Sequence, residues 1–169
     1  ALDANTTADG NTAIGYESLS ANISSELNTG IGFKALRLTT GADNTGVGAL
    51  ALDANTSGVQ NVALGRSALA SNTTASNNTA VGYASLLSNT TASFNTAIGA
   101  LAADALTAGD SNTAIGYAAL SSDTLGERAI AIGEGALLTQ NFTSETNNYN
   151  VAVGYNAGYA VTTGTNNTF

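Results

Sequence analysis

Carboxylates are the first residues of this sequence that could perform chemistry, because the chain has 12 Asp and Glu but no His and no Cys. Without His and Cys, the commonest general base, the Cys–His pair and most transition-metal sites are missing. Carboxylate oxygens suit Ca²⁺, but Asp9, Asp43 and Asp110 lie far apart in the sequence and form no Asp-x-Asp cluster. We therefore expect solvated carboxylates, no metal site, no cofactor and no enzymatic activity.

Two aromatic residues in a polar stretch are candidates for binding. Phe142 and Tyr149 lie within residues 139–149, which read TQNFTSETNNY. An aromatic ring presents a flat apolar face on which a sugar ring can stack. With Asn141, these residues form a predicted ligand loop, whose expected partner is a cell-surface glycan or a protein receptor. The alternative is a protruding turn without a ligand.

An internal repeat of 17 residues must position these side chains. The Gly of an Asn-Thr-Ala-Ile-Gly motif recurs nine times, and successive spacings are 17 residues except for one of 16 and the last of 21. The nine Gly residues are Gly15, Gly32, Gly48, Gly65, Gly82, Gly99, Gly116, Gly133 and Gly154. We number each unit from its Asn as position 1. A period of this length suits one coil of a β-solenoid and is too short for a helix-turn-helix repeat.

Position 4 indicates that each coil contains a β-strand. It is aliphatic in all nine units and β-branched in eight of them, a preference typical of strands. Alternation places the small residues of positions 3 and 5 on one face, and positions 2 and 4 on the other. Positions 2 to 5 hold no charged residue, so both faces are candidates for burial. We expect a second strand around the Leu of position 9 to cover one face and another subunit to cover the other.

The predicted fold is an all-β, parallel β-roll or β-solenoid of about ten 17-residue coils. It spans residues 1–169 as a single repetitive domain, with residues 139–149 as an inserted loop. Equal positions of consecutive coils should stack about 4.8 Å apart. The Asn side chains of position 1 should then form a structural amide ladder that satisfies turn backbone groups. Ala129 leaves one rung empty, and the members are Asn11, Asn28, Asn44, Asn61, Asn78, Asn95, Asn112 and Asn150.

A Thr column at position 13 supplies the alternative function. A flat ladder of Thr side chains is how some solenoids bind ice, so an ice-binding β-solenoid is the alternative to a fibre. Ile23 and Asn141 interrupt the column, and Thr also suits strands and turns for structural reasons alone. We expect the structural role for this column, whose members are Thr6, Thr40, Thr56, Thr73, Thr90, Thr107, Thr124 and Thr162.

Net charge and hydropathy exclude two classes of partner. The net charge of −8 repels nucleic acid and anionic membranes. No apolar run approaches the roughly 20 residues of a membrane-spanning helix, so we expect no direct membrane insertion. The absence of Cys removes disulfides as a source of stability.

The unit Asn-Thr-Ala-Ile-Gly-Tyr-x-Ala-Leu resembles the head repeats of trimeric autotransporter adhesins. It is also similar to the Asn-Thr-Ala-Val-Gly-Tyr repeats of phage tail fibres and bacterial surface fibres. This resemblance covers almost the whole chain, although adhesin heads have a shorter repeat. It implies a left-handed roll, a homotrimer about one axis, a structural or adhesive role in attachment to cells, and a location at a cell surface, outside the cell or in a virion tail fibre. Since the sequence begins and ends within a unit, we expect a fragment of a longer fibre.

Overall fold

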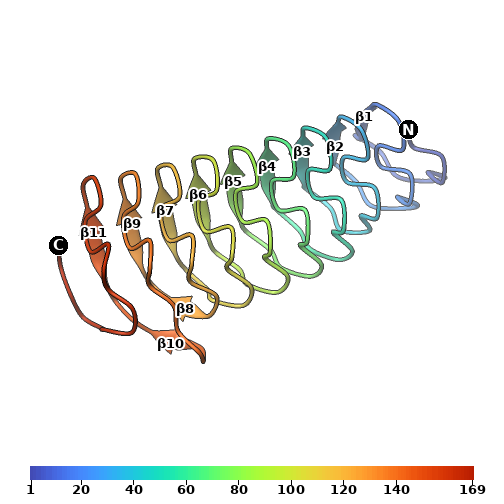
Figure 1. The fold of residues 1–169 in the computed structure, drawn as a ribbon. Helices are drawn as coiled ribbons and strands as arrows, with labels where there is room; N and C mark the ends of the chain where they lie inside the picture. The colour runs from blue at the N-terminus through green and yellow to red at the C-terminus, as the bar shows by residue number, and fades with distance from the viewer.

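The computed structural model describes residues 1–169 as a rod of stacked coils (Figure 1). One parallel sheet contains nine strands in chain order: β1 (Thr12–Ile14), β2 (Thr29–Ile31), β3 (Thr45–Val47), β4 (Val62–Leu64), β5 (Thr79–Val81), β6 (Thr96–Ile98), β7 (Thr113–Ile115), β9 (Ile130–Ile132) and β11 (Val151–Val153). A second sheet pairs β8 (Gly126–Glu127) with β10 (Thr146–Asn147). The chain contains no helix, and so none that could cross a membrane. The predicted all-β parallel solenoid is confirmed.

The strand register confirms the 17-residue coil. Ala80 lies opposite Ala97, and Val81 lies opposite Ile98, so equal repeat positions are neighbours. Nine strands give eight complete turns between β1 and β11, and the prediction of about ten coils is therefore slightly too high. Partial coils at both ends explain the difference, as at the bridge between Val151 and Thr168.

Each main coil contributes one strand to the long sheet, and the predicted second strand around position 9 is wrong. The position-9 residues have a left-handed backbone, with φ of 53° at Leu36 and 49° at Leu86. A left-handed residue does not continue an extended strand. The Leu side chain therefore enters the core from a turn. Positions 7 and 17 are also left-handed, as at Lys34 and Leu27, which leaves three such residues in each coil.

The core is built from small side chains of the strand and large side chains of the turn that faces it. Ala80 and Ala97 of position 3 are completely buried, and so are Leu69 and Leu86 of position 9. These side chains belong to one cluster that runs along the rod. Positions 2 and 4 face away from this cluster, as the alternation predicted. Their outer face has no cover within the chain.

Gly at position 5 meets two requirements of the coil stack. Its φ lies between +124° and +143° in all nine units, a region that side chains disfavour. A Cβ added at Gly82 would also lie only 2.5 Å from the carbonyl oxygen of Gly99 in the next coil. The Gly column therefore permits consecutive coils to approach closely.

Candidate functional site

The Asn side chains of position 1 form the predicted amide ladder. Oδ1 of Asn78 accepts a hydrogen bond from the N–H of Asn95 at 2.9 Å. Nδ2 of Asn78 donates to the carbonyl of Ala92, also at 2.9 Å. The same link to the next backbone N–H is made by Asn11, Asn28, Asn44, Asn61, Asn95, Asn112 and Asn150. All members except Asn11 are buried, so the ladder holds coils together and is shielded from ligands.

The inserted residues compensate for the rung that Ala129 leaves empty. Ala129 has no side-chain oxygen to accept a hydrogen bond from the N–H of Asn150. Asn148 supplies the acceptor instead, with its Oδ1 2.9 Å from that nitrogen. Gln140 Oε1 accepts a second hydrogen bond, from Asn150 Nδ2 at 2.8 Å. This repair is a function of the insertion that the sequence did not reveal.

A second Asn ladder lies at position 12 and was not predicted. Asn72 Nδ2 donates to Asn55 Oδ1 at 2.8 Å, and Asn89 Nδ2 donates to Asn72 Oδ1 at 3.1 Å. The next member is Leu106, which has no side-chain donor, so the buried Oδ1 of Asn89 has no partner. The recurrence of Asn at position 12 was the signal that could have identified this ladder.

Six of the eight Thr hydroxyls of position 13 donate hydrogen bonds within the rod: those of Thr40, Thr56, Thr73, Thr90, Thr107 and Thr124. Thr56 Oγ1 donates to the carbonyl of Thr73 at 2.9 Å, and Thr73 Oγ1 donates to that of Thr90 at 3.0 Å. The carbonyl of Thr73 also accepts the N–H of Thr56 at 2.8 Å. The hydroxyl donors of these six residues are therefore committed to the neighbouring coil, as expected for a structural role, and ice binding stays an untested alternative.

The inserted loop does not present both of its aromatic rings to solvent. Phe142 is only 5% exposed, and its N–H donates to Oδ1 of the buried Asp123 at 3.3 Å. This corrects the prediction for Phe142, because a ring inside the coil has no free face for a sugar. Tyr149 is 52% exposed, and Asn141 is also exposed. A binding role for Asn141 and Tyr149 remains a prediction.

The position-4 residues form an aliphatic stripe along the outer face of the long sheet. Its most exposed members are Ile14 at 60% and Val153 at 59%, and the others remain half-buried or exposed. The full stripe is Ile14, Ile31, Val47, Leu64, Val81, Ile98, Ile115, Ile132 and Val153. A row of partly exposed apolar side chains of this length is typical of an interaction surface.

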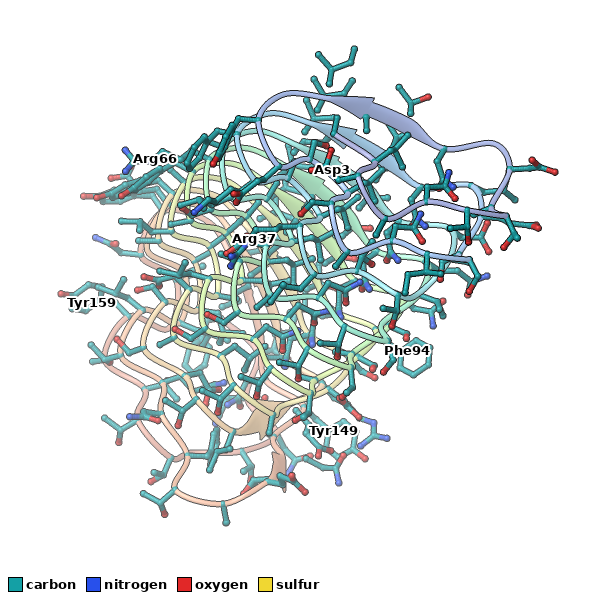
Figure 2. All side chains as sticks on the ribbon, turned by 90° about the vertical axis from the view of Figure 1, so that its right-hand side faces the viewer. Asp3, Arg37, Arg66, Phe94, Tyr149 and Tyr159 are labelled. Carbon is teal, nitrogen blue, oxygen red and sulfur yellow. The ribbon has the colours of Figure 1, made fainter.

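Aromatic residues of position 6 flank the stripe at the ends of the strands. Tyr16 and Phe33 stack with ring centroids 5.6 Å apart and an interplanar angle of 13°. Lys34 lies over the ring of Phe33 and Arg66 over that of Tyr83. Figure 2 shows Arg66 projecting from one side of the rod and Phe94 from the opposite side. The exposed aromatic residues of this row are Tyr16, Phe33, Tyr83, Tyr117 and Tyr155.

Asp104, at position 10, is a half-buried carboxylate without a partner for one oxygen. Its Oδ1 atom is buried and makes no hydrogen bond, and burial raises the pKa of the carboxyl group above its ordinary value of 3.8. In contrast, Asp53 at the same position pairs with Arg37, with Oδ1 2.7 Å from Nε. The folded state therefore disfavours the charged form of Asp104.

Asp104→Asn should stabilise the fold near pH 7, since it removes a half-buried charge and keeps the side-chain shape. Because the pKa of Asp104 is raised on folding, the wild-type chain gains stability as the pH falls through that pKa towards 3.8. The stability advantage of the variant should be largest near pH 7 and shrink in mild acid. Urea unfolding at several pH values measures it, and an advantage that is independent of pH would contradict this explanation.

The remaining surfaces are open rather than hollow. The rod has no enclosed pocket, and no three His, Cys, Asp or Glu residues gather closely enough to hold a metal ion. The chain matches no protein-family model, no curated protein and no solved structure.

Proposed function

We propose that this chain is a structural and adhesive segment of a homotrimeric surface or tail fibre, which supports or mediates attachment to a cell surface. The aliphatic stripe carries this proposal. A surface that repeats at every coil fits a partner with the same repeat, and another copy of this chain is such a partner. The resemblance of the repeat to fibre proteins supplies the number of three chains and the location outside the cell or on a virion.

The size of the stripe supports association along the whole rod. Complete burial of an Ile or Val side chain contributes about 1.5–3 kcal/mol. The nine stripe residues are already partly buried, so covering the remainder contributes on the order of 10 kcal/mol per chain. Association costs about 4–15 kcal/mol. Contact over all coils can offset this cost, whereas contact over one or two coils cannot.

The composition of the turns supports a passive fibre. They consist mainly of Asn, Thr, Ser and Gly with scattered carboxylates, which keep an elongated assembly soluble. The ladders of positions 1 and 12 and the Thr column use buried polar groups to hold the coils together. This division leaves the outward turns free to meet a receptor while the sheet face meets the other chains.

Replacement of Ile98 by Lys tests the assembly. We expect wild-type chains to sediment as trimers at micromolar concentration and the Ile98→Lys variant as monomers, because the charge would have to be buried between chains. Thr91→Lys is the matched control, since Thr91 is exposed in a turn of the same region, and this variant should remain trimeric. A wild-type chain that is folded and monomeric throughout this concentration range would exclude the proposal.

A further inference from the structure

The residues that directly precede position 1 of the next unit form a second exposed column with an unusual backbone. They are position 17 of a regular coil, and we call them position-17 residues also in the 16-residue unit of Asp43 and the 21-residue unit of Tyr149. All ten are exposed, and all have a left-handed φ between +50° and +70°. The column contains Gly10, Leu27, Asp43, Gln60, Asn77, Phe94, Ser111, Arg128, Tyr149 and Asn166. Figure 2 shows Phe94 and Tyr149 projecting from the same side of the rod. Each coil therefore presents one side chain from the same kind of turn.

Bulky residues in this column are unfavourable for the isolated chain. The left-handed region suits Gly, Asn and Asp, whereas bulky residues are strained there. Phe94 and Tyr149 are nevertheless 62% and 52% exposed, so packing within the chain offsets little of the strain. The left-handed turn recurs in every coil, so what calls for an explanation is the presence of bulky residues in place of Gly, Asn or Asp at these two exposed positions. A contact with another molecule would account for them.

The positions of these bulky residues along the rod indicate that they do not belong to the proposed interface between fibre chains. An interface between copies in register must recur at every coil, as the aliphatic stripe does. In the position-17 column, Phe94, Arg128 and Tyr149 are concentrated within four consecutive coils, and Asp43, Gln60 and Asn77 occupy the three coils before Phe94. The one other bulky residue, Leu27, is isolated from this group and lies beside Gly10 near the N-terminus. A contact restricted to part of the rod fits a ligand that is shorter than the rod.

We propose that Phe94, Arg128 and Tyr149 form a binding strip for an uncharged linear oligosaccharide. This inference rests on the adhesive role proposed above and names the ligand class. With a rise of about 4.8 Å per coil, Phe94 and Tyr149 are separated by about 14 Å along the rod, which requires an extended ligand. The two rings offer apolar faces for sugar rings. Between them, the Ser111 hydroxyl and the Arg128 guanidinium supply hydrogen bonds for sugar hydroxyl groups.

The charges around the strip favour an uncharged sugar. Arg128 is already paired with Glu127, with Nη1 3.1 Å from Oε2. Asp110 lies in the preceding coil, where its carboxylate accepts the N–H of Ser93 at 2.7 Å. With a net charge of −8 on the chain, sulfated or carboxylated sugars would be repelled. The strip therefore has donors and acceptors for hydroxyl groups but no excess positive charge.

The test measures binding and folding on the same variants. The wild-type chain is screened against immobilised uncharged oligosaccharides of glucose, galactose, mannose and N-acetylglucosamine, and affinity for the best one is measured by calorimetry. Phe94→Asn and Tyr149→Ala should each weaken binding about tenfold or more, because each removes an aromatic anchor. Phe94→Asn should also raise the Tm, since Asn suits the left-handed backbone. Tyr117→Ala removes an exposed aromatic residue of position 6 and should leave the affinity unchanged.

Either of two results would contradict the proposed binding strip. One is the absence of binding to every member of the panel at millimolar concentration, and the other is unchanged affinity in both Phe94→Asn and Tyr149→Ala. Light scattering on the same samples separates this inference from the fibre proposal. A trimer that binds no sugar would contradict the binding strip and support the fibre proposal. A monomer that binds sugar through Phe94 would support the binding strip and contradict the trimer.

Discussion

Gly82→Ala should lower the free energy of unfolding by about 4 kcal/mol or more. The backbone of Gly82 has φ of +134°, where any Cβ is strained. The new Cβ would also lie 2.5 Å from the carbonyl oxygen and 2.6 Å from the carbonyl carbon of Gly99. Both are backbone atoms of the next coil, so relief requires the two coils to separate. Chemical unfolding followed by circular dichroism measures the loss.

Gly154→Ala is the matched control because it has the strain without the collision. Its φ is +136°, and the nearest atom to an added Cβ is the Ala157 Cβ at 3.9 Å. We expect a loss of about 1–3 kcal/mol for this variant. The difference between the two variants isolates the cost of close coil stacking. Equal losses would show that backbone strain alone explains the Gly column, and would contradict the stacking argument.

The repeat made most of the architecture predictable. When a unit recurs at a constant interval, equal positions must stack, so the assignment of one strand at positions 2 to 4 determines all nine. Alternation placed position 3, as at Ala80, and position 4, as at Val81, on opposite faces of the strand. Stacking and alternation depend only on strand geometry and on the constant period. Which of the two faces lies in the core came from the structure, where Ala80 is completely buried and Val81 is half-buried.

The repeat pattern could not show that the expected second strand around position 9 is absent, because its absence follows from the backbone conformation of the position-9 residues. A Leu such as Leu36 has no intrinsic preference for the left-handed region, and non-Gly residues are uncommon there. Burial of the Leu side chain against Ala residues of position 3 imposes this conformation, and tertiary packing overrides local preference. The left-handed column of position 17 is concealed for a different reason, since its exposed members vary from Gly10 to Phe94 and share no residue type that signals a left-handed backbone.

The path of the inserted loop, residues 139–149, also could not be predicted from the sequence pattern. A polar stretch with two aromatic residues predicts a surface loop, and this is correct for Tyr149. Phe142 is drawn inwards, with its N–H bonded to Asp123 and its carbonyl bonded to Thr124 Oγ1 at 3.2 Å. Those partners belong to the preceding coil and are fixed only when the coils stack. Side-chain position within an insertion is therefore set by neighbours that the repeat does not specify.

Asn78→Ala should destabilise the fold by about 2 kcal/mol. Asn78 is 1% exposed, and its side chain satisfies the N–H of Asn95 and the carbonyl of Ala92, each at 2.9 Å. Truncation leaves the Asn95 N–H buried without a partner, and an unsatisfied buried group costs about 1–3 kcal/mol. The Ala92 carbonyl loses one of its two donors and keeps Asn89 Nδ2 at 2.9 Å. Urea unfolding measures the effect. Asn77→Ala, which changes an exposed neighbour, should cost about 1 kcal/mol or less.

The missing Asn at Ala129 offers a second test of the amide ladder. The chain tolerates a missing amide there because Asn148 and Gln140 provide acceptors for Asn150. No insertion accompanies Asn78, so its loss has no substitute. Asn148→Ala should therefore destabilise the wild-type chain by removing the acceptor for the Asn150 N–H, but should have little effect once Ala129→Asn restores the regular rung. Equal effects of Asn148→Ala in both backgrounds would show that the ladder does not carry the stability assigned to it.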